Sequence, residues 1–180
     1  MLVLGILGSA CGGSDAPPAS SAGASTLQLR GVDDIVSRTS QEWGATELTC
    51  PGEDAAGCLA SRSGVSVVVL GADQMEKYVL EAVVVDGGDV EEATAHPGTP
   101  ASMGWSVAVQ LSREGTDALA SATQAALDAA PPRNRIAIVV DGLVVSSPTV
   151  AAPITSGAVV VAGGLSHAEA ERLASNLSGD

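Results

Sequence analysis

The clearest pattern of apolar and polar positions lies in the last third of the chain. Five apolar residues at 136–140 are followed by Asp141 and Gly142, and then by three more apolar residues at 143–145. A two-residue type I′ turn needs positive φ at both central positions, which aspartate tolerates and glycine adopts freely. This pattern predicts a β-hairpin with Asp141 and Gly142 at its tip.

Two prolines follow the hairpin and limit how the chain continues. Proline lacks a backbone donor and is confined to edge strands, strand ends and bulges. Because residues 146–154 contain Pro148 and Pro153, we expect this segment to form an edge strand or a bend over one.

Glycines flank the next apolar run. Gly157 precedes residues 158–162, which contain only alanine and valine and predict a short strand. The glycine pair that begins at Gly163 is expected to end this strand.

Capping signals and apolar spacing predict two helices. Ser166 with Glu169 three residues later forms a capping box, which marks a helix start. Apolar residues then repeat at the spacing of one helix face, namely Ala170, Leu173, Ala174 and Leu177. An earlier helix is predicted over residues 112–130, with Ser112 as its cap and an apolar face of Leu119, Ala122, Ala126 and Ala130.

Shorter apolar runs earlier in the chain predict strands. Residues 65–70 are rich in β-branched side chains, residues 27–30 alternate apolar with polar, and residues 105–111 form a third run. The segment 32–43 fits either a helix or an extended arm. Strands covered by late helices indicate an α+β fold. We expect one domain over residues 27–180, with a mostly antiparallel sheet and two helices packed on one face.

The order of these motifs resembles the end of the first periplasmic domain of SecD, a protein-export subunit. That family reads approximately A-I-V-L-D-G-x-V-x-S-x-P, then P-I-x-x-G, then G-x-[FL]-[ST]-x-x-E-A-x-x-L-A-x-x-L. The positions filled here include Asp141, Gly142, Pro148, Pro153, Gly157, Gly163, Ser166 and Glu169. The resemblance extends more weakly upstream to about Leu27 and implies the head subdomain of SecD.

The resemblance implies a binding role. The head of SecD is implied to engage the emerging preprotein, while membrane helices of that protein couple movement to the proton gradient. We therefore expect a non-enzymatic domain that binds polypeptide or an envelope protein, such as a component of the Sec translocon. The alternative is a scaffold or interaction module of the cell envelope that reuses the fold without taking part in translocation.

Charge narrows the class of partner. The 180 residues include 21 Asp and Glu but only 8 Lys and Arg, which gives a formal net charge of −13. Such a surface repels phosphate backbones and anionic lipid head groups. Composition therefore argues against nucleic-acid binding.

The N-terminal residues indicate export and a lipid anchor. Residues 1–10 form an apolar run that ends in small residues before Cys11, similar to the lipobox of bacterial lipoproteins, in which the cysteine receives diacylglycerol. The run lacks the positive charge that opens a signal peptide, so we expect the translation start to lie upstream. Residues 11–26 predict a disordered tether with a reach of roughly 20 Å. We expect an extracytoplasmic domain anchored to the membrane through Cys11. The alternative is that residues 1–10 are a short apolar stub with no role in anchoring.

The two remaining cysteines predict a disulfide. Cys50 and Cys58 form an even pair in a chain that we expect to be exported. Metal binding is the competing interpretation, but it needs further ligands, and the only histidines are His96 and His167. We expect a disulfide and no metal.

Candidate catalytic residues have simpler interpretations. Ser166, His167 and Asp141 are the residue types of a hydrolase triad, but the chain has no G-x-S-x-G motif, and the capping box already accounts for Ser166. The adjacent acids at 33–34 and 91–92 are typical of solvated surface. We therefore expect no catalytic residue and no cofactor, and a hydrolase is the third and weakest hypothesis.

Overall fold

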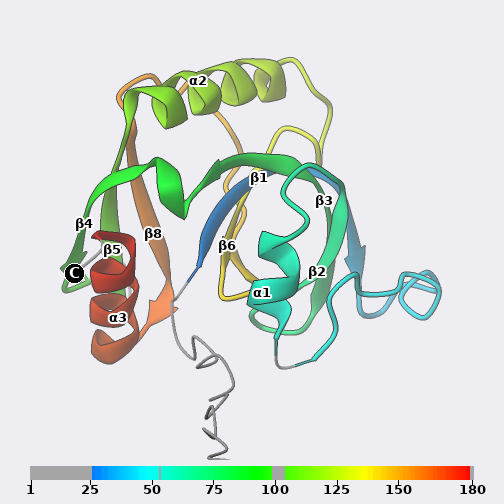
Figure 1. The fold of residues 1–180 in the computed structure, drawn as a ribbon. Coiled ribbons are helices and arrows are strands. Elements are labelled where there is room, and N and C mark those ends of the chain that lie inside the picture. The colour runs from blue at the N-terminus through cyan, green and yellow to red at the C-terminus, as the bar shows by residue number, and fades with distance from the viewer. Residues whose placement is uncertain (1–25, 53, 99–103, 179–180) are drawn as a thin grey trace, which may run out of the picture.

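The computed structural model describes residues 26–52, 54–98 and 104–178, which form two sheets, three α-helices and one 3-10 turn (Figure 1). The elements in chain order are β1 Leu27–Ser37, α1 Ala55–Ala60, β2 Val67–Gly71, β3 Glu76–Asp86, η1 Gly87–Asp89, β4 Val90–His96, β5 Trp105–Leu111, α2 Arg113–Leu127, β6 Ile136–Val140, β7 Leu143–Ser146, β8 Ala158–Leu165 and α3 His167–Ser178. The predicted α+β class is confirmed. The sequence did not predict α1 or the division of the strands between two sheets.

Five strands close into a barrel in the order β1-β3-β2-β7-β6. Four of the neighbouring pairs are antiparallel, namely β1 with β3, β1 with β6, β2 with β3 and β6 with β7. The fifth pair, β2 with β7, is parallel and joins only Leu70 to Leu143 and Gly71 to Val144. This short parallel contact closes the barrel.

Strand β6 is buried on both faces, which explains its unbroken apolar sequence. Ala137 and Val139 belong to the cluster of apolar side chains that also contains Val67, Val69 and Leu80. Ile136, Ile138 and Val140 belong to a second cluster, shared with β5, β8, α2 and α3. Alternate residues of one strand therefore serve two cores, and β6 joins the barrel to the rest of the molecule.

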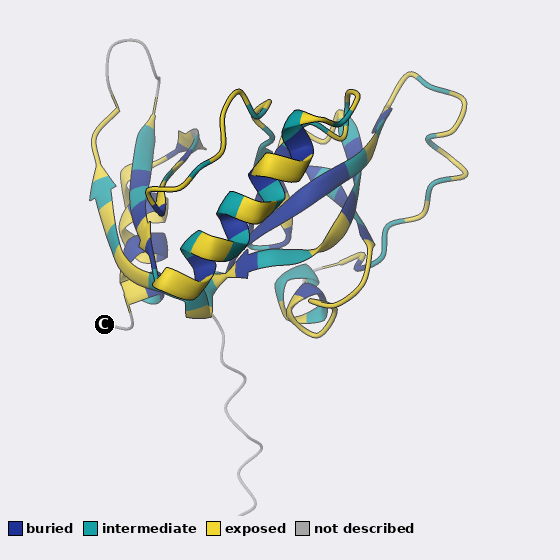
Figure 2. Ribbon diagram, turned by 90° about the horizontal axis from the view of Figure 1, so that it is seen from above, coloured by how far each residue is buried: buried dark blue, intermediate teal, exposed yellow. Residues whose placement is uncertain are grey.

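The second sheet has the order β4-β5-β8 and is covered on its inner face. Helix α3 buries the four apolar residues that the sequence predicted, Ala170, Leu173, Ala174 and Leu177, in the same cluster as Val107 and Val161 of the sheet. Helix α2 adds Leu119 to that cluster and turns its other side to solvent (Figure 2). Both predicted helices thus contribute to one core, but α3 packs against β4 and β5, whereas α2 lies mainly against β3 (Figure 1).

The predicted hairpin is confirmed. Asp141 has φ of 49° and Gly142 has φ of 84°, as the type I′ turn requires. A Cβ on Gly142 would come within 2.7 Å of the Ala55 Cβ atom. Glycine is needed here both for the backbone conformation and for the approach of α1.

Two boundaries differ from the predictions. The segment 32–43 is the extended arm and not a helix, because β1 continues to Ser37 and turns follow. Helix α2 ends at Leu127 instead of residue 130, since Pro131 and Pro132 disfavour helical geometry in the residues before them.

The prediction that Gly163 ends its strand is wrong. Strand β8 continues to Leu165, but its pairing with β5 shifts from Ser106 with Ala162 to Trp105 with Leu165. The glycines therefore form a bulge inside the strand.

The proline segment bends as predicted and pairs along one side with residues 134–136. The Val150 N–H donates to the Asn134 carbonyl at 2.9 Å, and Pro148 accepts from the Ile136 N–H at 3.3 Å. The Ile154 N–H donates to the Thr123 hydroxyl at 3.0 Å. This segment extends the hairpin ladder and is tied to α2.

A buried arginine joins three parts of the barrel. The Arg30 side chain on β1 is 0% exposed, and its guanidinium donates to Gln28 Oε1 at 3.0 Å. It also donates to the carbonyl oxygens of Arg62 at 3.1 Å, Val65 at 3.0 Å and Glu81 at 2.8 Å. Burial lowers the pKa of Arg30. The planar guanidinium fills the irregular pairing between β1 and β3 with donors that the ladder there lacks.

The only lysine of the chain holds the loop that follows β1. Lys77 Nζ on β3 donates to the carbonyl oxygens of Trp43 at 2.7 Å and Thr46 at 2.6 Å. The same ammonium lies 4.3 Å from the centroid of the Trp43 ring. Lys77 thus fixes the loop by hydrogen bonds and a cation–π contact.

Replacing Arg30 by methionine should lower the free energy of unfolding by about 3–5 kcal/mol, because buried acceptors lose their donors. The measurement is urea unfolding of the oxidised protein. The matched control is Arg113→Met, at a side chain that is 94% exposed, where a change below about 0.5 kcal/mol is expected. Equal stability of the two variants would contradict the structural role of Arg30.

Candidate functional site

The outer face of the second sheet is exposed and built from small or polar side chains. Its shallow hollow, of about 250 Å³, is lined by residues of all three strands, including Glu92, Thr94, His96, Ala108, Gln110 and Val160. Apolar side chains of this sheet, such as Val107 and Val161, point to the opposite face. Among the residues that the structure describes, no helix packs on the outer face.

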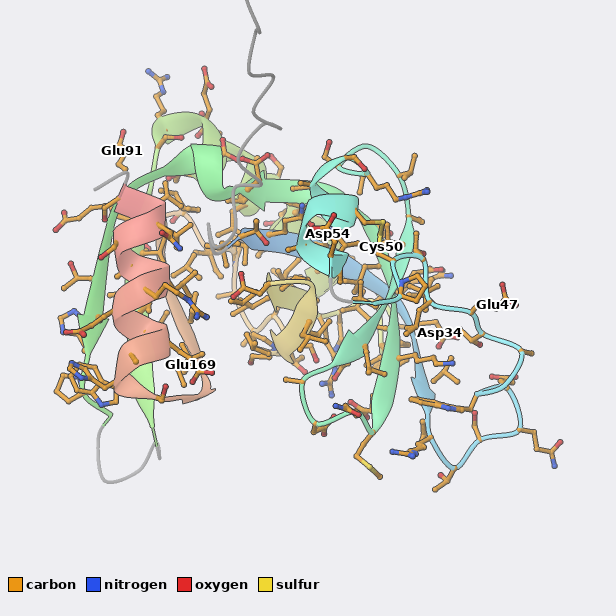
Figure 3. All side chains as sticks on the ribbon, turned by 60° about the horizontal axis from the view of Figure 1, so that its bottom comes forward. Asp34, Glu47, Cys50, Asp54, Glu91 and Glu169 are labelled. Carbon is orange, nitrogen blue, oxygen red and sulfur yellow. A yellow bond between two sulfur atoms is a disulfide. The ribbon has the colours of Figure 1, made fainter. Side chains whose placement is uncertain are left out.

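The middle of one edge of this sheet, on β4, is capped by a residue of α3. The hydroxyl of Ser178, the last residue of α3, accepts from the Ala93 N–H at 3.2 Å and donates to the Ala93 carbonyl at 3.1 Å. Ala93 lies in the middle of the edge strand β4. Helix α3 therefore supplies the hydrogen bonds that a further strand would make there, and Glu91 at the same edge is charged (Figure 3).

The opposite edge, β8, is different. Leu111 N–H donates to the Gly157 carbonyl at 2.9 Å, and the register continues with Val109 opposite Val159 and Val107 opposite Val161. In an antiparallel ladder, hydrogen-bonded pairs alternate with pairs whose polar groups point away. The backbone N–H and C=O of Val160 therefore point away from β5, to the outer edge.

A groove adjoins the end of β8. Its volume is about 290 Å³, and it lies between that strand, the start of α3 and the β6–β7 hairpin. The lining includes Leu143, Leu165, Asp141, Glu169 and Arg172. Figure 3 shows Glu169 at the first turn of α3. Arg172 Nη2 lies 3.6 Å from Asp141 Oδ2, so an ion pair bridges the groove.

The predicted capping box is present at the rim of this groove. The Ser166 N–H donates to Glu169 Oε2 at 2.8 Å, and the Glu169 N–H donates to Ser166 Oγ at 3.3 Å. The Ser166 hydroxyl also donates to Glu169 Oε2 at 2.7 Å. These hydrogen bonds from Ser166 lower the pKa of Glu169. Both residues thus start α3, as predicted from their spacing.

The structure distributes the other motif residues over the fold. Asp141 and Gly142 form the hairpin tip beside the groove, whereas Gly157 lies at the opposite end of β8. A side chain on Gly157 would collide with Thr116 of α2, and its φ is 68°. Pro148 and Pro153 lie in the bend. The motif is therefore a structural frame around β8 and does not converge on one point.

Cys50 and Cys58 form the predicted disulfide, with their Cα atoms 5.8 Å apart. Cys50 is buried and lies beside α1, which Asp54 precedes (Figure 3). In the described part of the chain, no group of three or more His, Cys, Asp or Glu side chains is placed to hold a metal ion.

The residues considered for a hydrolase triad have separate partners. Ser166 is bonded to Glu169, whereas His167 Nε2 lies 2.9 Å from Glu171 Oε1. The His167 ring centroid is 4.0 Å from that of Trp105. Asp141 Oδ1 accepts from the Thr26 N–H at 2.9 Å.

Most of this fold matches a known protein family. Residues 66–180 match the family described as SecDF, P1 head subdomain, which is more than half of the chain. The chain belongs to the SecDF P1 head family. The matched region contains β2 to β8 and both long helices, so it includes the frame around β8. The predicted family resemblance is confirmed for this domain.

Individual relatives agree with the assignment. The protein translocase subunit SecD of Streptomyces coelicolor is 32% identical over 149 residues, which are 81% of this chain. The P1 head chain spans about a quarter of the length of that relative, since the alignment covers 26% of it.

Solved structures share the fold. One, described as the membrane component SecDF that enhances protein export, has a TM-score of 0.50 at 20% identity and covers 86% of this chain and 62% of its own. A crystal structure of SecDF in a super-membrane-facing form has a TM-score of 0.52 at 19% identity, over 87% of this chain and 19% of its own.

Two features bear on attachment to a membrane, namely the predicted lipid anchor and the presence or absence of a spanning helix. Cys11 and nearly all of the predicted tether lie outside the described residues, so lipidation stays a prediction. Within the described parts of the P1 head chain, no helix has both the length and the apolar character needed to span a bilayer.

Sequence reasoning missed the residues that define the two sheet edges. Ser178 contacts Ala93 although the two residues are 85 positions apart in the sequence. A pattern of neighbouring residues cannot predict a contact of this kind. Val160 was assigned only to a strand. The signal that could have found this edge is its uncharged run from Ala158 to Leu165, whereas β4 carries Glu91 and Glu92.

Replacing Ser166 by alanine should lower the free energy of unfolding, measured by urea unfolding, by about 1 kcal/mol, because α3 loses its cap.

The stability that Glu169 contributes should depend on pH. Since the pKa of Glu169 is lowered in the folded state, its stabilising effect is present above the usual glutamate pKa and is lost as pH falls through the lowered pKa. Comparing wild type with Glu169→Gln by urea unfolding at several pH values checks this. The stability difference should shrink in acid, and a difference independent of pH would contradict the assignment.

Proposed function

We propose that this chain is an extracytoplasmic, non-enzymatic P1 head domain that binds polypeptide and assists Sec-dependent protein export. Membership of the SecDF P1 head family is the observation that carries this proposal. The relative from Streptomyces coelicolor is named a protein translocase subunit, and one structural neighbour is described as enhancing protein export. Because the chain matches only the head, we assign it contact with a polypeptide or envelope partner and not the whole activity of SecD.

The disulfide supports the compartment. Cys50 and Cys58 are joined beside the barrel core. Disulfides persist in oxidising environments outside the cytoplasm and are rare inside it. This pair therefore favours an extracytoplasmic location, in agreement with the lipobox-like sequence around Cys11.

Membrane attachment would place the head near the translocon. Acylation of Cys11 followed by a polar tether of residues 11–26 would hold the domain roughly 20 Å from the lipid surface by random-coil scaling. The net charge of −13 would keep the head itself from lying on anionic lipid. Its exposed sheet would then remain available to a protein partner.

The exposed second sheet supports binding over catalysis. Its outer face and the β8 edge offer backbone groups and small side chains. Groups of this kind recognise extended chains with little dependence on sequence. This property suits a domain that meets many different exported polypeptides.

The test is deletion of the gene in its native host, followed by pulse-chase measurement of the export of a secreted reporter. We expect slower export, restored by the wild-type gene expressed from its native start. Complementation by Cys11→Ala should give protein that is absent from the membrane fraction and restores export poorly, because anchoring raises the local concentration of the head. Unchanged export with altered envelope assembly would contradict the proposal and favour the scaffold alternative.

A further inference from the structure

We propose that the outer edge of β8 is a docking site at which an extended, non-acidic polypeptide segment adds to the second sheet as a fourth strand. This inference rests on the proposed function and assigns it to a particular place on the head.

The backbone of β8 presents groups to a new strand at alternate residues. Val159 and Val161 face β5 within the ladder, so the polar groups of Ala158, Val160 and Ala162 face outward. The Ala158 N–H donates to Ser156 Oγ at 3.3 Å. Within the described residues, no backbone or side-chain group bonds to the outward groups of Val160.

The two edges of the same sheet differ in the hydrogen bonds that their outward backbone groups make. At β4, the outward groups of Ala93 are satisfied by the Ser178 hydroxyl. At β8, the Val160 side chain is 60% exposed, the highest value among the large apolar residues that are exposed. An uncharged, apolar edge of eight residues is the kind that natural proteins usually block. Leaving it open is consistent with use as a pairing surface.

The surroundings of β8 determine what the added strand meets. Side chains on one face of that strand would lie along Val160 and the small outer residues of the sheet. Side chains on its other face would lie toward the barrel, where the groove at the end of β8 offers Leu143 and Val145. An alternating strand with apolar residues on the barrel side would fit both surfaces.

Charge selects a polypeptide over a second copy of this chain. Residues 158–162 read AVVVA, which is symmetric about Val160 and would suit antiparallel pairing between two copies. Two copies would each bring a net charge of −13, and their repulsion opposes that dimer. Glu92, across the outer face on β4, and Glu169 in the groove add negative charge near β8, and Arg172 of the groove is paired with Asp141. The favoured occupant is a segment of unfolded polypeptide that is apolar or basic.

The test measures binding of a fluorescent peptide of about ten residues, with alternating valine and threonine and a lysine at each end, by anisotropy. Val160→Pro removes the outward N–H without removing a donor to β5, so edge pairing should be lost while the sheet remains. Ala95→Pro is the matched control, because the register places its N–H on the outer side of β4. We expect binding to weaken at least about tenfold in Val160→Pro, remain near wild type in Ala95→Pro and recover in Val160→Thr.

Two peptides N-methylated on opposite sets of alternate residues provide a test that needs no change in the protein. Only the peptide whose methyl groups face β8 should lose binding, because one side of an added strand pairs with the edge. Equal binding of both peptides, or wild-type affinity of Val160→Pro, would overturn the β8 site while leaving polypeptide binding by the head intact. No binding to any peptide would overturn both the site and the proposed function. A concentration-dependent dimer that Val160→Pro abolishes would show that a second copy is the occupant instead.

Discussion

The fold depends on the burial of β6 on both faces. Ala137 and Val139 contribute to the barrel core, while Ile136, Ile138 and Val140 contribute to the core beneath the second sheet. A polar residue at any of these positions would lose hydration on whichever side it faced. Because β6 is fixed by both cores, the hairpin tip, the groove and β8 keep their relative positions. The site on the second sheet is therefore placed by packing elsewhere in the molecule.

Two of the eight basic residues are used inside the fold, which makes the exposed surface more acidic than composition alone suggests. Arg30 and Lys77 are both buried and both donate to backbone carbonyl oxygens. Carbonyl groups that no strand or helix satisfies must find other donors, and long cationic side chains supply several at once. The irregular segments around the barrel are thereby ordered at the expense of surface positive charge. This acidic surface in turn disfavours self-association and anionic partners.

Short sequence motifs were enough to predict several elements of the fold. Asp141 with Gly142, and Ser166 with Glu169, determine a turn and a helix start through neighbours within three residues, so the sequence was enough to predict them. Barrel closure could not be predicted in this way, because the pairing of β2 with β7 joins Leu70 to Leu143. The closed edge at Ala93 likewise depends on Ser178 from the far end of the chain. The family resemblance named the head but could not show which strand edge was open.

The proposed binding function rests on an asymmetry in one three-stranded sheet. Its inner face packs in the core and α3 caps one edge at Ala93, whereas, in the part of the chain that the structure describes, nothing bonds to the outward groups of Val160 on β8. In the proposed binding mode, an extended polypeptide would pair with β8 without any reorganisation of the core. Gly157 and the capping box would then affect the proposed binding only through the position of β8.

Native-state hydrogen exchange, followed residue by residue by NMR, tests this account most directly. The amides of β6 and those of Val159 and Val161 should exchange only through global unfolding, with one common free energy, because they lie in joined cores and in the β5 ladder. The Val160 amide should exchange rapidly, as an exposed edge donor does. Slow exchange at Val160, or separate opening free energies for β6 and β8, would contradict the account.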